Sequence, residues 1–153
     1  AFLGPLIGSI IRPPAGLISD KIGGGLVTLV CSILLCIGAI GVTFSTSPQS
    51  AADFAPFLFW MLLLFFASGV GNGSTFQQIP FIFPPQEAGP VLGFTSIAAY
   101  GSFIFPVLFG WALSSFGTPN MAFYIFFAFY AVCLVLNWWY YTRPGCEKPC
   151  KAV

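Results

Sequence analysis

The chain has 153 residues, of which 58% are hydrophobic and only 6% charged, with a mean hydropathy of +0.93. Soluble domains carry about 25% charged residues, so this composition excludes an ordinary soluble domain and indicates a membrane protein. The net charge of +1 gives no electrostatic basis for binding nucleic acid. Histidine is absent, which removes the commonest general base and metal ligand.

Five long apolar segments follow one another, separated by short polar connections. We expect an all-α, polytopic transmembrane bundle, a half-bundle over residues 1–143 with a cytoplasmic tail over 144–153. The predicted helices cover about residues 1–18, 26–46, 54–83, 92–116 and 121–142. About 20 apolar residues cross ~30 Å of hydrocarbon, so the third segment must tilt, bend or extend beyond the bilayer. The chain opens inside an apolar run without an initiator methionine, and we interpret it as the C-terminal portion of a longer membrane protein.

The first segment contains Arg12, the only ionisable residue inside an apolar run. Pro13 and Pro14 follow it and lack backbone donors, so we expect the helix to break there. A charge in hydrocarbon costs at least ~2.5 kcal/mol by insertion scales, and membrane proteins keep one where it faces protein, water or an ion of opposite sign. Arg12 therefore indicates a small-anion site. The alternative is that Arg12 snorkels to an interface roughly 9 Å away at ~1.5 Å per residue, and the residues alone leave both interpretations open.

Polar residues cluster in the third segment. Ser68, Gly71, Asn72 and Thr75 share one helix face, by their spacing of three and four residues. This face offers neutral donors to a cavity, and Phe76 adds a flat wall. Such a cavity beside an arginine would bind a monovalent anion without a compensating acid.

Two pairs of glycines predict close helix packing. Gly4 and Gly8 in the first segment, and Gly69 and Gly73 in the third, have the small-xxx-small spacing that lets neighbouring helices approach.

The connections indicate the orientation. One side of the predicted bundle holds Lys21, Arg143, Lys148 and Lys151, whereas the loops on the other side contain no Lys or Arg. By the positive-inside rule the first side is cytoplasmic, and the aromatic run 138–141 forms an interfacial belt.

The five cysteines do not indicate a disulfide framework. Cys31, Cys36 and Cys133 lie in apolar segments, where cysteine behaves as a small hydrophobe. Cys146 and Cys150 have C-x-x-x-C spacing, and a reduced tail is favoured over a metal pair because no further Cys or His is nearby. We expect neither a metal nor a cofactor.

Two sets of motifs resemble a known family. The stretch 16–24, with Gly16, Asp20, Lys21 and Gly24, resembles the G-x-x-x-D-[RK]-x-G signature of the major facilitator superfamily, whose acid and base make contacts that a rocking motion breaks and reforms. The stretches 71–77, 83–89, 92–96 and 98–101 closely resemble the nitrate/nitrite porters, a branch of that superfamily. The resemblance implies that the five segments correspond to helices eight to twelve of a twelve-helix transporter. Its partners would be the lipid bilayer and the missing N-terminal half, in the bacterial inner (plasma) membrane with a cytoplasmic C-terminus.

The resemblance also implies roles for single residues. Arg12 matches an arginine that grips nitrate or nitrite together with a partner arginine in the missing half. Phe76 matches an aromatic residue that packs against the planar anion, and Ser96 matches a ligand-facing hydroxyl. Asn72 and Thr75 belong to the same motif. Gly101 adds a further helix-packing glycine, although the chain is one residue shorter than the family pattern between Ser96 and Pro106.

We therefore expect transport of nitrate and nitrite by alternating access, in nitrate assimilation, and no enzymatic activity. The apolar segments contain no acid or histidine, which favours nitrate/nitrite exchange over proton symport. The alternatives are a facilitator for another small anion or solute, or an inactive fragment. A membrane-embedded transferase would need a cluster of His or carboxylate groups that this sequence lacks.

Overall fold

The computed structural model describes residues 2–47, 51–99 and 103–146. Over these residues it is helical with no strands, which confirms the predicted all-α class. The predicted packing glycine Gly101 and all of the predicted tail beyond Cys146 lie outside the described residues.

The helices follow one another with short connections. Their bounds are α1 Leu3–Ile10, α2 Arg12–Ile22, α3 Gly24–Thr43, α4 Phe54–Ile82, α5 Pro85–Ala99, α6 Ile104–Phe116 and α7 Asn120–Asn137. A 3-10 turn at Ala51–Asp53 precedes α4, and a π-helical turn, η3 (Trp138–Thr142), continues α7.

Three described stretches are long and apolar enough to span a membrane by length and composition: Gly24–Thr43, Phe54–Ile82 and Asn120–Thr142. The last consists of α7 together with η3. α6 is apolar but shorter. At ~1.5 Å per residue, α4 is about 43 Å long, which exceeds the hydrocarbon thickness and requires tilt or protrusion.

The first apolar segment is divided into two helices at Ile11. Pro13 and Pro14 cannot donate to the carbonyls of Ser9 and Ile10, so the regular ladder stops there. The amides on either side still bond normally, with Ile11 N donating to Ile7 O at 3.1 Å and Ala15 N donating to Ile11 O at 3.0 Å. Proline at the start of α2 is tolerated because the first amides of a helix have no intrahelical partner.

The connection between α2 and α3 is a single residue, Gly23. Its φ of 103° lies in the region that favours glycine, and its amide donates to Ser19 O at 2.9 Å. The polar sequence 19–25 is therefore helical on both sides of Gly23, and Asp20 and Lys21 belong to the last turn of α2.

The fourth segment differs from the expectation at its start. α5 begins at Pro85, whereas the helix predicted from the sequence begins at Leu92. Proline suits the first helical position because its φ is already helical, and Glu87 in the first turn interacts favourably with the helix dipole. The amides of Glu87 and Ala88 both donate to Pro84 O, at 2.9 and 3.0 Å.

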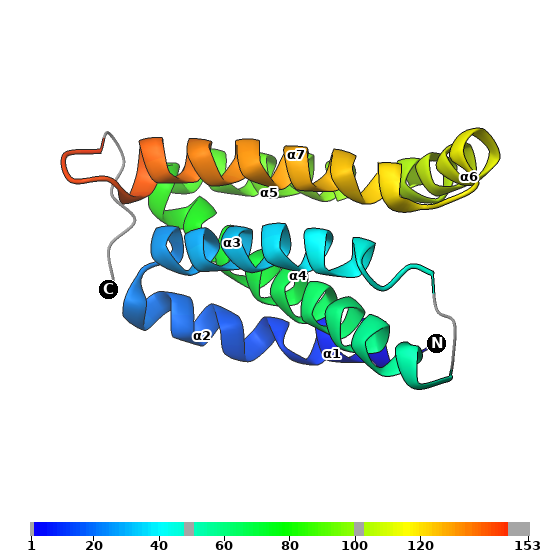
Figure 1. Cartoon of the computed structure of the whole chain (residues 1–153). Helices are drawn as coiled ribbons and strands as arrows, with labels where there is room; N and C mark the ends of the chain where they lie inside the picture. Colours follow the sequence, from blue (N-terminus) through cyan, green and yellow to red (C-terminus); the bar gives the residue numbers. More distant parts are fainter. Residues whose placement is uncertain (1, 48–50, 100–102, 147–153) are drawn as a thin grey trace.

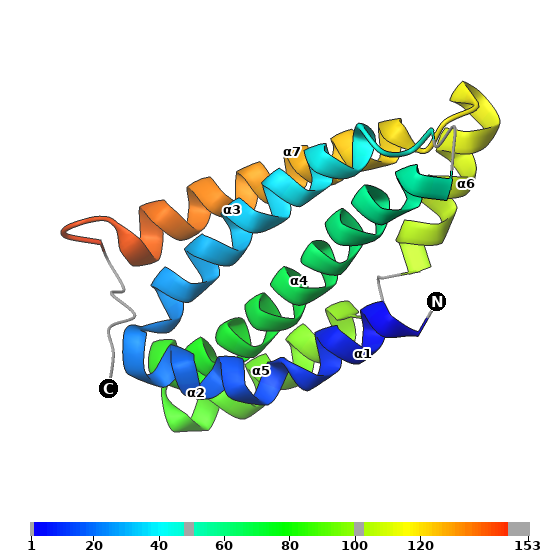
Figure 2. The ribbon, with the colours of Figure 1, turned by 60° about the horizontal axis from the view of Figure 1, so that its bottom comes forward.

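The helix α4 lies at the centre of the arrangement. It contacts α1 and α2 on one side, α3 on another and α5 at its end, and Figure 2 shows it between α3 and the α1–α2 pair. Figure 1 shows α7 alongside α3, which it contacts along its length. α6 contacts α7 alone among the described helices, through ring pairs such as Phe109 and Phe123 at 5.2 Å.

Hydrogen bonds made by side chains join α3 to its neighbours. Gln78 Nε2 donates to Thr28 Oγ1 at 2.6 Å, and the hydroxyls of Thr28 and Ser74 share a hydrogen bond at 2.8 Å. Asn137, at the end of α7, donates from its amide to Gly25 O at 2.9 Å. These bonds fix the register of α3 against both α4 and α7.

The bond between Thr28 and Ser74 can be tested by Ser74→Ala. Interhelical hydrogen bonds in membrane proteins contribute about 0.6 kcal/mol on average and up to about 1.7 kcal/mol, and we expect a loss of stability in this range. Thermal unfolding of the purified protein in detergent measures it. Ser114→Ala is the matched control, because the exposed Ser114 hydroxyl donates only within its own helix, to Trp111 O at 3.0 Å. Equal stability of the two variants would contradict the interhelical role.

Candidate anion site

Glycines allow α1 and α2 to lie directly on α4. A Cβ added to Gly69 would collide with Gly8 O and the Ile11 side chain, and one added to Gly4 would collide with the Phe65 ring. A Cβ on Gly73 would lie 2.7 Å from Arg12 O and 3.3 Å from Ala15 Cβ. The structure thus brings the predicted packing glycines Gly8 and Gly69 together and seats the backbone of Arg12 on Gly73.

Three sides of α4 have different surroundings. At 100° per residue, Gly69 and Gly73 face α1 and α2, while the buried Ala67, Ser74 and Gln78 face α3. The face formed by Ser68, Gly71, Asn72 and Thr75 is turned away from α1 and α2, and one edge of it adjoins α3: a Cβ on Gly71 would lie 3.5 Å from Cys31 Cβ, and Ser68 lines a cavity together with Leu35 and Ala39. Ser68 and Thr75 are exposed, and Gly71 and Asn72 are half-buried. Within the described residues, the part of the predicted polar face that carries Asn72 and Thr75 is therefore open.

Arg12 and this polar face lie at the same level of the bundle. Arg12 is an exposed residue at the start of α2. Its backbone contacts Gly73, which is within one helical turn of Asn72, Thr75 and the half-buried Phe76. Four of the five predicted substrate residues thus lie at one level of the bundle, with the cation on α2 and the others on α4. Arg12 rests on the Gly73 side of α4, whereas at 100° per residue Asn72 and Thr75 lie about 100° and 160° around the helix from Gly73.

Ser96 is the exception. It is exposed on α5, and its hydroxyl donates within its own helix to Leu92 O at 2.8 Å. Among the described elements α5 contacts α4 only, so the structure does not bring Ser96 to Arg12. The hydroxyl of the exposed Thr75 is also bonded within its helix, to Gly71 O at 2.7 Å.

The residues of the turn motif have separate surroundings. Asp20 is half-buried and accepts a hydrogen bond from Gln77 Nε2 at 2.6 Å, whereas Lys21 is exposed. A Cβ on Gly24 would collide with Gln78 and come within 2.8 Å of Gln77 Oε1, while a Cβ on Gly16 would meet nothing within 4 Å. The role of Gln77 as partner of Asp20 was not evident from the sequence, because it depends on the register of α2 on α4.

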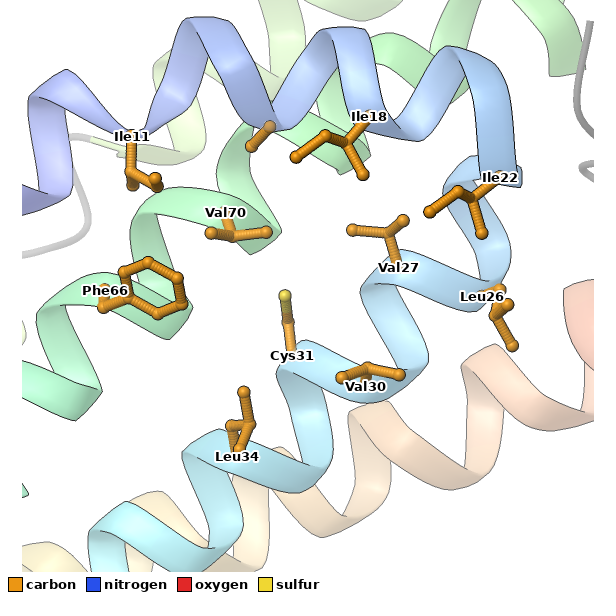
Figure 3. Close-up of a pocket in the computed structure, with 11 residues that line it drawn as sticks. Ile11, Ile18, Ile22, Leu26, Val27, Val30, Cys31, Leu34, Phe66 and Val70 are labelled. Atoms are coloured by element: carbon orange, nitrogen blue, oxygen red, sulfur yellow. The ribbon is translucent and has the colours of Figure 1, made fainter.

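A cavity of about 360 Å³ lies on a different side of α4 (Figure 3). Its lining is entirely apolar and comes from α2, α3, α4 and the residue before α2: Ile11, Ala15, Ile18, Ile22, Leu26, Val27, Val30, Cys31, Leu34, Phe66 and Val70. Burying an anion without hydrogen-bond donors is strongly unfavourable, so this cavity is unsuited to one. The open polar face and this apolar cavity are thus distinct surfaces of α4.

The part of the chain that the structure describes contains no group of three His, Cys, Asp or Glu side chains that could hold a metal ion. The described cysteines Cys31, Cys36, Cys133 and Cys146 are free, and Cys150 lies outside the described residues.

The seating of Arg12 on Gly73 can be tested by Gly73→Ala. The added methyl group would meet the Arg12 carbonyl, so α2 must move, and overpacking of this kind costs about 1–3 kcal/mol. We expect a lower unfolding temperature in detergent. Gly110→Ala is the control, since a Cβ there meets nothing within 4 Å. If both variants unfold at the same temperature, α2 does not rest on Gly73.

Comparison with known proteins identifies the family. The family model described as Major Facilitator Superfamily matches residues 1–152. A probable nitrate/nitrite antiporter, NarK2 of Thermus thermophilus, is 50% identical over 151 residues, which cover 98% of this chain and 34% of the relative. The nitrate/nitrite transporter NarU of Escherichia coli is 36% identical, over 94% of this chain and 36% of NarU. A probable nitrate transporter, NarT of Staphylococcus carnosus, is 30% identical, over 91% of this chain and 34% of NarT.

The chain spans about a third of the length of these relatives. The relatives named nitrate/nitrite transporters agree with the resemblance noted in the sequence, and the family match extends over nearly the whole chain. The chain therefore belongs to the major facilitator superfamily.

Proposed function

We propose that this chain is the C-terminal-half portion of a nitrate/nitrite transporter and that Arg12 is one of two arginines that bind the anion. The observation that carries the proposal is the seating of Arg12 on Gly73, at the level of Asn72, Thr75 and Phe76. The 50% identity to a probable nitrate/nitrite antiporter supports the choice of substrate.

The chemistry of this group suits nitrate and nitrite. Both ions are planar, singly charged hydrogen-bond acceptors, and a guanidinium is a planar fork of donors. The neutral Asn72 amide on α4 can donate further bonds, whereas the Thr75 hydroxyl already donates to Gly71 O. The Phe76 ring offers a flat apolar surface. A second arginine from the other half of the transporter would complete a site near the bilayer midplane, where such transporters bind their substrates.

Membership of this family and the three apolar spans make the chain part of an integral multi-pass membrane protein. In the proposed orientation, the α2–α3 turn and the C-terminal end face the cytoplasm across the inner membrane. Lys21 and Arg143 support this orientation by the positive-inside rule. Arg143 also lies over the Trp139 ring, 4.0 Å from its centroid, as expected of a residue anchored at the interface.

We further propose exchange of nitrate for nitrite by alternating access. A proton symporter needs a titratable group near the substrate, and the four acids of this chain, Asp20, Asp53, Glu87 and Glu147, lie outside the apolar cores. The same distribution disfavours a membrane-embedded transferase, which would need a His or carboxylate cluster.

The role of Arg12 is tested by Arg12→Lys in the complete transporter. One ammonium cannot reproduce the bidentate fork, and a hydrogen bond to a charged group contributes about 1.5–3 kcal/mol, so we expect nitrate uptake to fall by about tenfold or more. Arg143→Lys is the matched control and should transport normally. Uptake by Arg12→Lys at the level of this control would indicate that Arg12 only snorkels.

Exchange is tested with labelled nitrate and proteoliposomes that contain the complete transporter. Uptake should occur only into vesicles loaded with nitrite or nitrate, and it should persist when a protonophore collapses the proton gradient. Empty vesicles are the control. Uptake that follows the proton gradient into empty vesicles would establish symport instead.

A further inference from the structure

The side chain of Gln77 joins α4 to the last turn of α2. Gln77 Nε2 donates to Asp20 Oδ1 at 2.6 Å. Hydrogen bonds to an ionised group are shorter and roughly twice as strong as those between neutral groups. Asp20 belongs to the motif that links α2 to α3, so this bond connects that motif to the helix that carries Asn72, Thr75 and Phe76.

The bond between Gln77 and Asp20 holds the C-terminal end of α2. The first end, at Arg12, rests on Gly73, and Gln77 follows Gly73 by four residues, so both contacts lie on the same side of α4. The break at Ile11 separates α2 from α1. Contacts of α1 with Phe65 and Gly69 therefore cannot by themselves fix the rotation of α2, and a second contact beyond Gly73 is needed.

The orientation of the Gln77 amide is determined by Asp20. Gln77 Oε1 is buried without a hydrogen-bond partner in the described structure, as is Ser19 Oγ on the neighbouring turn. Reversing the amide would turn its oxygen toward the Asp20 carboxylate, where two acceptors would repel each other. The buried oxygen is thus left unpaired so that the nitrogen can reach Asp20.

We propose that Gln77 is a positioning residue for the anion site: by holding Asp20, it fixes α2 on α4 and so fixes the direction from which Arg12 meets the anion. The consequence for transport rests on the proposed function. The hydrogen bond between Gln77 and Asp20, which we call the clamp, does not. It also gives Asp20 a neutral partner on α4 within this chain, rather than only the charged contacts that the motif suggested.

The neighbouring residue provides a matched control. Gln78 is also on α4, and its Nε2 also donates at 2.6 Å, but the acceptor is Thr28 Oγ1 on α3. Gln77→Leu and Gln78→Leu therefore remove the same chemical group from the same helix, and only the first releases α2.

The first experiment measures nitrate uptake by the complete transporter in proteoliposomes. Misplacement of a binding group by about 1 Å can cost about a hundredfold, and we expect Gln77→Leu to raise the KM for nitrate by about ten- to a hundredfold. Gln78→Leu should leave the KM within about twofold of the unsubstituted protein, because α3 does not carry Arg12. Equal KM values for the two variants would overturn the positioning role.

The second experiment exchanges donor and acceptor. Gln77→Glu places two carboxyl groups within hydrogen-bond distance, where one must take up a proton to avoid repulsion. Its KM should fall toward the normal value as the pH is lowered, because a protonated glutamic acid can donate to Asp20. The double variant Asp20→Asn/Gln77→Glu restores the bond with the roles reversed, and its KM should be near normal and independent of pH. If Gln77 only filled space, Gln77→Glu would show no such pH dependence.

A third measurement is independent of nitrate. Thermal unfolding of Asp20→Ala, Gln77→Leu and the double variant forms a double-mutant cycle, in which each single substitution removes the bond without introducing a new charge contact. Non-additive stabilities would establish the clamp even if the unsubstituted protein did not transport nitrate, and in that case the proposed function alone would fail. Additive stabilities, or coupling without any change in the KM of Gln77→Leu, would overturn the positioning role.

Discussion

The close approach of α4 to the α1–α2 pair is the contact on which the rest of the structure depends. It is possible only because glycines remove side chains at the crossing, with Gly8 O against Gly69 and Arg12 O against Gly73. In a bilayer, lipid tails are as apolar as leucine, so helices associate through close packing and hydrogen bonds rather than by leaving water. The glycines therefore determine both the association of these helices and the level at which Arg12 meets α4.

Polar bonds then fix what packing alone leaves adjustable. Smooth glycine surfaces permit sliding and rotation, and four side-chain bonds restrict both. Gln77 holds Asp20 of α2, Gln78 and Ser74 hold Thr28 of α3, and Asn137 holds the start of α3. These bonds gather at the end of the bundle near the α2–α3 turn.

Several features could be predicted from the sequence because they follow from single residues. Pro13 and Pro14 predicted the break in the first segment, since a missing donor has the same effect in any surroundings. The start of α5 at Pro85 was missed because its prolines indicated a loop, although proline at the first position and an acid in the first turn also mark a helix start. The close approach of Gly38 and Gly41 to Leu64 and Trp60 was not singled out either, because the sequence does not indicate which face of α3 meets α4.

The candidate site could be predicted only in part for the same reason. The face of Asn72 and Thr75 follows from helical spacing, and Arg12 from its charge. Predicting the bond between Gln77 and Asp20 requires the offset of α2 along α4. The packing of Gly69 against Gly8 and of Gly73 against Arg12 sets that offset. The placement of Ser96 depends on how α5 meets the bundle, and its connection to α6 includes residues 100–102, which lie outside the described residues.

The apolar cavity of Figure 3 has a consequence for how this sequence can vary. A cavity of about 360 Å³ separates α2 from α3 on that side. Positions that line it, such as Ile18 and Val27, therefore have room for larger apolar side chains, whereas Gly69 and Gly73 have none. Substitutions should therefore accumulate unevenly around α2, freely on the cavity side and hardly at all on the side of α4. Variation among natural sequences at these positions would record which face of the helix is structurally constrained.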